Sequence, residues 1–222
     1  MVVLATKVYV SGDAQQRALD SLGSLVANEV GDLDVEWTVG LRHDGFPSVT
    51  LEGEDRTAAR NVLRETWGAI TGEFEEGETY VGTLEQWDDE GVVLDAGTPI
   101  RIPSSELGLG AGTPAQIRTR LGLVQHMPLR FVYGDPSRLA DEERDRLYDW
   151  TREDHGRVNV NSATRAEVRA TVNRAGHARD VVTIERLGLL EQSIVCGEGT
   201  DPPGLLASIG RYLPSELLAV VP

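Results

Sequence analysis

The stretch that decides the fold is VNVNSATRAEVRATVNRAG, residues 158–176. Its alternating start predicts a strand, and Ser162 is expected to cap a helix that Gly176 ends. The apolar positions of that helix recur at helical spacing, at Val168, Val172 and Ala175. A hairpin is then expected around Gly188, followed by a second helix from Pro202 and a closing strand over 216–222. This β-α-β-β-α-β order predicts a ferredoxin-like (split βαβ) module over residues 157–222.

Working outward, residues 1–76 have a similar order of elements. Residues 2–10 are rich in β-branched side chains and predict a strand, and the helix that follows is expected to stop at Gly31. Two strands over 35–41 and 48–53 come next, then a helix capped by Asp55. With an optional last strand near residue 73, this predicts a second ferredoxin-like module.

Between the two modules, residues 77–134 contain three short apolar runs separated by tight turns, over 79–87, 92–95 and 99–103. Such a meander is typical of a small β-barrel. Residues 104–112 are expected to be a loop, followed by a short helix capped by Thr113 and a last strand over 129–133.

Residues 135–156 are strongly charged and predict a connector helix, capped by Asp135 with Pro136 at its first position. The predicted fold class is therefore α+β, with two ferredoxin-like modules flanking a small OB/SH3-like β-barrel.

The composition indicates the environment in which the protein works, but it does not indicate a function. The chain has one lysine, Lys7, among 21 basic residues, and its 36 acidic residues give a net charge of −15. An acidic, lysine-poor surface suits a protein that works in multimolar salt, because carboxylates hold water and ions while lysine adds an apolar stem. We therefore expect the cytoplasm of a salt-loving archaeon. Codon bias in a high-GC genome is the alternative, but it would explain only the arginines and not the acid excess.

Few features point to catalysis. The four histidines show no metal-binding spacing, and the glycine-rich stretch at 108–112 fits neither the dinucleotide nor the P-loop pattern. Cys196 stands alone among apolar neighbours and is expected to be buried. No stretch is apolar enough for a membrane helix or a secretory leader. We therefore expect a cytoplasmic, non-enzymatic protein with no catalytic residue, no cofactor, no metal and no membrane partner.

Positive charge is concentrated in two islands. Residues 101–130 and 157–187 each carry a net charge of +3, which leaves −21 for the rest of the chain. Guanidinium groups bind phosphate in a bidentate manner and stack on bases, which suits RNA. The candidate RNA-binding residues are Arg101, Arg118, Arg120, Arg130, Arg165 and Arg169. The alternative is that these arginines pair with acids from other modules.

The middle module also resembles a known family. The motifs Gly82-Thr83-Leu84, Gly91-Val92-Val93-Leu94-Asp95 and Ile100 to Leu107 are similar to the OB-type RNA-binding barrel that is repeated in the largest small-subunit ribosomal protein. The family's base-stacking aromatic is replaced here by Val92 or Val93, and its usual histidine by Pro103. The complete chain resembles an uncharacterised conserved archaeal (haloarchaeal-type) protein family of unknown function, which implies no activity.

The leading hypothesis from the sequence is an RNA-binding or ribonucleoprotein-associated protein in translation or ribosome assembly, with structured RNA or a ribosomal particle as partner. It predicts that charge reversal of Arg118 and Arg120 weakens RNA retention. The rival hypothesis is a ligand-sensing or protein-interaction module that forms a homodimer through its ferredoxin-like sheets. An enzyme ranks third.

Overall fold

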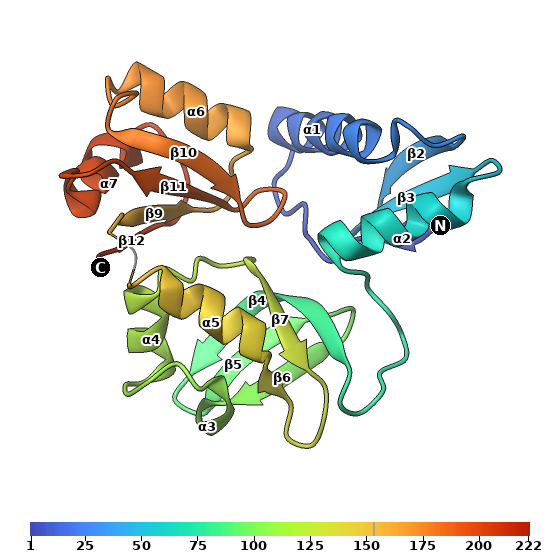
Figure 1. Ribbon diagram of the computed structural model, residues 1–222, viewed down its shortest axis with the longest axis horizontal. Coiled ribbons are helices and arrows are strands. Elements are labelled where there is room, and N and C mark those ends of the chain that lie inside the picture. The colour runs from blue at the N-terminus through green and yellow to red at the C-terminus, as the bar shows by residue number, and fades with distance from the viewer. Residues whose placement is uncertain (153) are drawn as a thin grey trace.

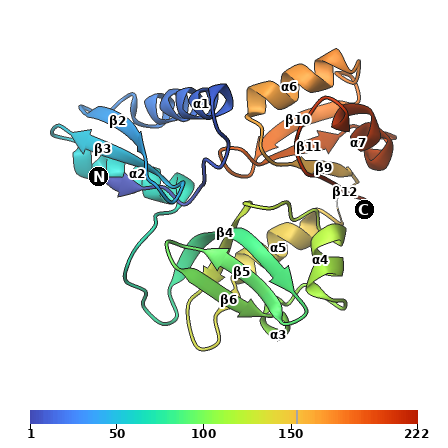
Figure 2. The same cartoon turned by 180° about the vertical axis from the view of Figure 1, so that it is seen from behind.

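The computed structural model describes residues 1–152 and 154–222. It is a mixed α+β protein with three antiparallel sheets, one in each of three domains. The N-terminal and C-terminal domains lie side by side, and the central domain lies beneath both of them (Figures 1 and 2). This triangular arrangement brings every domain into contact with the other two.

The N-terminal domain has one three-stranded sheet with strand order β1-β3-β2. Its elements are β1 (Val2–Val3), α1 (Asp13–Val30), β2 (Glu36–Leu41), β3 (Pro47–Glu52) and α2 (Arg56–Trp67). The long first strand expected over residues 2–10 is wrong, since pairing with β3 ends at Val3. The side chains of the following residues bond to the other two domains instead. The optional strand near residue 73 is also wrong, because no strand lies between α2 and β4.

The central domain is a curled half-barrel of five strands in the order β6-β5-β4-β7-β8. Its strands are β4 (Thr79–Asp88), β5 (Gly91–Asp95), β6 (Pro99–Pro103), β7 (Pro128–Val132) and β8 (Arg138–Leu139). Its helices are α3 (Ser104–Leu107), α4 (Pro114–Arg120) and α5 (Asp141–Asp149). The cap at Thr113 is confirmed, with a reciprocal hydrogen-bond pair to Gln116. The loop expected over 104–112 is partly wrong, because it begins with α3.

The helix expected to begin at Asp135 begins at Asp141 instead. The residues before it form a turn and the short strand β8, which pairs with β7. Leu147 and Trp150 then pack into the same core as the half-barrel strands. The sparse apolar positions of this charged helix are therefore anchors to the central domain.

The C-terminal domain has four strands in the order β10-β11-β9-β12. Its elements are β9 (Arg157–Val160), α6 (Arg165–Arg174), β10 (Val181–Arg186), β11 (Gln192–Cys196), α7 (Pro202–Gly210) and β12 (Leu217–Val220). The expected cap at Ser162 is wrong. Thr164 caps α6 in a capping box with Glu167, so the helix starts two residues later than Ser162 allows.

The domains share their hydrophobic cores. Leu189 and Leu190, at the turn between β10 and β11, pack into the core of the N-terminal domain, and Val220 of β12 packs into the central core. Cys196 is fully buried, as expected. Among the described residues, none of the helices combines the length and apolar character that crossing a bilayer requires.

Candidate functional site

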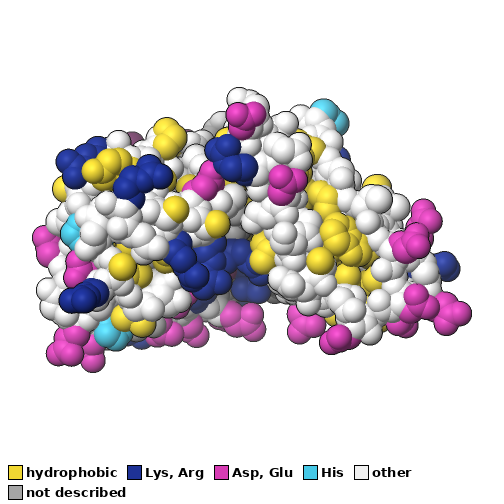
Figure 3. All heavy atoms as spheres, turned by 90° about the horizontal axis from the view of Figure 1, so that it is seen from above, with side chains coloured by type: hydrophobic (Ala, Val, Ile, Leu, Met, Phe, Trp, Pro, Cys, Tyr) yellow, Lys and Arg dark blue, Asp and Glu magenta, His cyan; other side chains and the backbone are white. Residues whose placement is uncertain are grey.

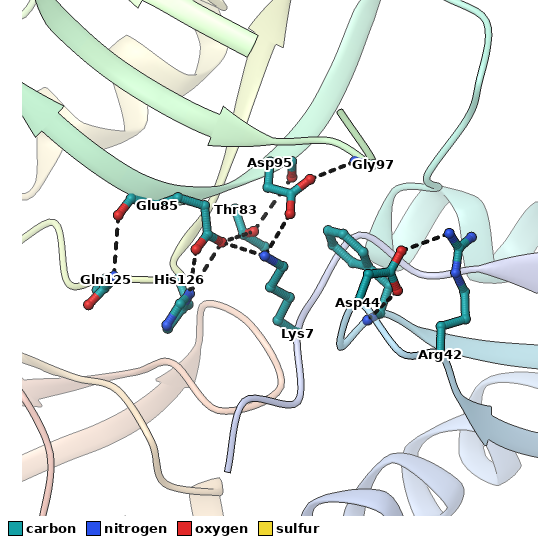
Figure 4. Close-up of polar contacts among 10 residues, drawn as sticks. Lys7, Arg42, Asp44, Thr83, Glu85, Asp95, Gly97, Gln125 and His126 are labelled. Atoms are coloured by element: carbon teal, nitrogen blue, oxygen red, sulfur yellow. Dashed lines mark hydrogen bonds and ion pairs between the residues drawn. The ribbon is translucent and has the colours of Figure 1, made fainter. Parts of the chain in front are cut away.

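The only lysine of the chain lies at the contact between the N-terminal and central domains. Lys7 Nζ is 2.9 Å from Glu85 Oε1 and 2.7 Å from Asp95 Oδ2 (Figure 4). Burial acts to lower the pKa of Lys7, but the bonds to Asp95 and Glu85 outweigh it and raise that pKa. One ammonium group thus holds two carboxylates of the half-barrel.

Glu85 has two further hydrogen-bond partners on its other side. His126 Nδ1 lies 3.2 Å from the Glu85 carboxylate, and Thr83 Oγ1 donates a hydrogen bond of 2.7 Å to it. Burial acts to raise the pKa of Glu85, but the bonds from His126, Lys7 and Thr83 lower it to about 2. Glu85 is therefore held as a carboxylate by three hydrogen-bond partners.

Tyr9, two residues after Lys7, reaches the C-terminal domain. Its hydroxyl donates a 2.6 Å hydrogen bond to Glu191 Oε1 and accepts one of 2.8 Å from the backbone N–H of Ser162. Glu191 is fully buried, and burial raises its pKa to about 8. We call Lys7, Tyr9, Glu85, Asp95, His126 and Glu191 the interdomain clasp.

Backbone strain is concentrated at this clasp. His126 (φ 67°) and Ser162 (φ 59°) are the non-glycine residues with positive φ among the described part of the chain. Both contact Tyr9: the His126 ring lies 3.9 Å from the Tyr9 ring, and Ser162 donates to its hydroxyl. Such backbone conformations persist only where the surroundings enforce them, so Tyr9 holds a strained junction.

Arginines line a hollow between two of the domains. A cavity of about 520 Å³ lies between the C-terminal and central domains, and we call it the arginine cleft. Four arginines line it from α5, β9, α6 and β10, together with two carboxylates: Arg146, Arg157, Arg165, Arg186, Asp149 and Glu185. Seen from above, basic side chains gather in the hollow between the N-terminal and C-terminal domains (Figure 3).

Two of these arginines are held in place by other residues of the protein. Arg157 bonds to Glu185, and Arg186 lies over the Trp67 ring at 4.4 Å and 3.5 Å from Glu29. Burial lowers the pKa of Arg186, the nearby charge of Arg165 lowers it further, and Glu29 acts in the opposite direction. Cations that repel one another in a half-buried hollow favour the binding of an anion.

Three of the six arginines predicted from the sequence have partners within the protein. Arg101 forms a bidentate pair with Asp88, with both N–O distances 2.9 Å. Arg118 is buried, bonds to Glu216 and stacks on Trp87 at 3.6 Å. The alternative of pairing with an acid from another module therefore describes Arg118, whereas the partner of Arg101 lies in the same module.

Arg120 has a different internal role. It donates to the carbonyl oxygens of Leu109 and Ala111, at 2.6 and 2.9 Å, and so holds the glycine-rich loop. Its partners are backbone atoms, which explains why the loop before α4 is ordered.

The other three predicted arginines lie at open hollows. Arg165 and Arg169 face a shared hollow between α6 and Ser21 of α1, as their i, i+4 spacing indicates. Arg130 of β7 lines two further cavities. Within the described residues, none of these three side chains has an ion-pair partner. The structure therefore brings Arg165 and Arg169 together at one end of the arginine cleft, away from Arg101.

Sequence reasoning missed Arg146, and it did not select Arg157 or Arg186 although both belong to the second island. Arg146 is surrounded in sequence by acidic residues of α5, which hide it in any average of charge. A signal was present, because Arg146 lies one helical turn before Trp150 and its guanidinium is 5.1 Å from that ring.

Three family models match the chain in succession. They are described as the DUF2110 N-terminal domain over residues 1–73, the DUF2110 central domain over 74–151 and the DUF2110 C-terminal domain over 155–221. A search of the curated proteins returned no match. Because the three matches cover nearly the whole sequence, the chain belongs to the DUF2110 family, a family of unknown function.

Proposed function

We propose that this protein is a non-enzymatic RNA-binding protein that holds the phosphates of structured RNA in the arginine cleft. The observation that carries the proposal is that, among the residues the structure describes, four arginines and two carboxylates line one cavity in a chain whose net charge is −15. The planar guanidinium group of arginine can donate two parallel hydrogen bonds to two phosphate oxygens. A local excess of cations on an otherwise acidic protein calls for an anionic partner.

The position of α6 adds to the proposal. Arg165 lines both the arginine cleft and the hollow that contains Arg169, so the basic surface continues along the first turns of the helix. Both side chains are exposed and can reach a ligand without breaking an internal pair. An RNA backbone lying along this surface would meet several guanidinium groups in succession.

The finer fold assignments support the same proposal. The strand order β10-β11-β9-β12 and the helix positions fit a ferredoxin-like module, and the curled five-stranded sheet fits an OB-type barrel of the ribosomal kind. Modules of both types occur in RNA-binding proteins. Translation or ribosome assembly, in the cytoplasm of a salt-loving archaeon, is the setting that we propose.

In that setting salt screens bulk charge, so binding must depend on direct contacts. The test uses a fluorescein-labelled hairpin RNA and fluorescence anisotropy across a potassium chloride series. Arg165→Glu should weaken binding by roughly tenfold or more, because a charge-assisted hydrogen bond is lost and a repulsion added. A glutamate at the first position of α6 is compatible with the helix.

Arg60→Glu is the matched control, because Arg60 is an exposed helical arginine on α2, outside the cleft. It should bind like the wild type. RNA crosslinking and sequencing in the protein's own cells provides the second measurement. Equal binding by Arg165→Glu and wild type, or no RNA recovered by crosslinking, would refute the proposal.

A second candidate function is a protein-interaction module that dimerises through its sheets. It is favoured by one observation: β10 is an outer strand of its sheet, and Val182 on it is 63 % exposed. Sedimentation analysis tests it, because a dimer that Val182→Lys dissociates would support this function, whereas a monomer at all concentrations would exclude it.

A further inference from the structure

A smaller and more enclosed cavity opens from the arginine cleft, and we call it the inner slot. Its volume is about 140 Å³, and it shares Arg146, Arg186 and Leu187 with the cleft. Arg130 is the third arginine of its wall, and much of the remaining wall is small or apolar, including Ala5, Pro128 and Leu129. The inner slot therefore joins all three domains.

The far end of the slot is narrow. Gly68 and Val81 lie between it and the next cavity, and a Cβ on Gly68 would be only 2.7 Å from Val81 Cγ2. The backbone of Gly68 and the side chain of Val81 are therefore packed closely at the boundary between the two cavities.

Two of the three guanidinium groups around the slot, those of Arg146 and Arg186, are oriented by contacts within the protein. Arg146 Nε donates a 3.0 Å hydrogen bond to Glu143 Oε1, and Glu143 is 1 % exposed. The other oxygen of Glu143 accepts from the backbone N–H of Arg130 at 3.1 Å. Arg186 is held by Glu29 and Trp67. The slot is thus a preorganised cationic site with one buried carboxylate in its wall.

We propose that the inner slot takes a phosphomonoester, the terminal phosphate of an RNA chain or of a nucleotide, while the attached nucleoside lies in the arginine cleft. The proposal rests on the proposed function and names the part of the RNA that is recognised. A phosphate group fills the space of a few water molecules, each about 30 Å³, so the slot has room for it. The larger cleft has room for the sugar and the base.

The chemistry favours a monoester over a phosphodiester. A monoester has a charge of about −1.5 to −2 and three acceptor oxygens, which matches three guanidinium groups. A diester offers two free oxygens and one charge, and its chain must continue on both sides. Burial lowers the pKa of Arg186 and the charge of Arg165 lowers it further, so a dianion in the slot would also relieve the repulsion from Arg165.

The experiment compares one hairpin RNA, internally labelled with fluorescein, with a 5′-phosphate, with a 3′-phosphate, or with hydroxyl groups at both ends. Direct binding of adenosine 5′-monophosphate is measured separately by isothermal titration calorimetry. We expect one phosphorylated end to bind about tenfold more tightly than the hydroxyl ends, as for one added charge-assisted contact. Arg130→Gln should abolish this difference between phosphorylated and hydroxyl ends. Arg60→Gln, the matched control, should retain the preference.

The outcomes separate the inference from the proposed function. Equal binding of all three RNAs would overturn the inner slot as an end-binding site and leave RNA binding intact. Binding of adenosine 5′-monophosphate but of no RNA, with loss in Arg130→Gln, would support the phosphomonoester site with a free nucleotide as its source and refute the RNA function. Binding of neither ligand would overturn both.

Discussion

The interdomain clasp and the arginine cleft are neighbours with opposite charge balance. In the clasp, one ammonium group meets the carboxylates of Glu85 and Asp95, and Tyr9 meets Glu191. In the cleft, four arginines meet two carboxylates. The difference teaches that polar contacts inside the clasp hold the domains together, whereas the described lining of the cleft has more cations than carboxylates.

The clasp should be the more sensitive region for stability, and Lys7→Met gives the largest expected effect. It leaves Glu85 and Asp95 facing each other without their ammonium partner, so we expect a loss of about 3 kcal/mol in the free energy of unfolding. Chemical denaturation measures it. Arg42→Gln, which removes the surface pair with Asp44, is the control and should cost less than about 1 kcal/mol. Similar losses in both variants would contradict the importance of the clasp.

The pH dependence of stability tests the other half of the clasp. Burial raises the pKa of Glu191 from 4.5 to about 8, so the folded protein retains a proton that the unfolded chain has released. This contribution is fully present below pH 4.5 and is lost as pH rises towards 8, by a few kcal/mol. Glu191→Gln should flatten the curve in this window. An unchanged slope in the variant would show that another group titrates there.

Below pH 4.5, the dependence of stability on pH has the opposite sign. The pKa of Glu85 is lowered to about 2, so its contribution is present above pH 4.5 and is lost as pH falls towards 2. Lys7→Met should reduce the loss of stability at acid pH, and it should leave unchanged the loss of stability between pH 4.5 and 8. The same denaturation series, extended to acid, measures both.

A packing change gives the smallest of the expected effects. A Cβ on Gly188 would overlap Glu191 Oε2 and lie 2.9 Å from Pro128 Cδ, so Gly188→Ala should cost about 1–3 kcal/mol. Gly210→Ala is the matched control, because nothing lies within 4 Å of its Cβ position. If the two alanine variants unfold together in a thermal melt, the hairpin turn is not tightly packed against the clasp.

Much of the local structure could be predicted from the sequence, because helix caps, turns and apolar spacing act over a few residues. Thr113 with Gln116, and the helical spacing of Val168 and Val172, are examples. The failures have a physical cause as well. Residues 4–10 have the composition of a strand, but Lys7 and Tyr9 bond to other domains, and tertiary contacts outweigh β propensity there.

Only part of the candidate site could be predicted from the sequence. Arg165 and Arg169 share a helix face, which spacing alone predicts. Arg101 and Arg118 have the same residue type and similar local charge, yet they have internal partners. Arg146 was hidden among acids of its own helix. Net charge over a window counts residues that are adjacent in sequence, whereas an ion pair depends on distance in space.

The sequence by itself determined the α+β character, most of the order of the elements, the acidic balance and the presence of a single lysine. Only the tertiary structure decided that this lysine is buried between domains, with its side chain 11 % exposed, and that Arg101 and Arg118 have acidic partners. Lys7 is 78 positions from Glu85, and Tyr9 is 182 positions from Glu191. Contacts of that separation follow from domain packing, which no local pattern of residues specifies.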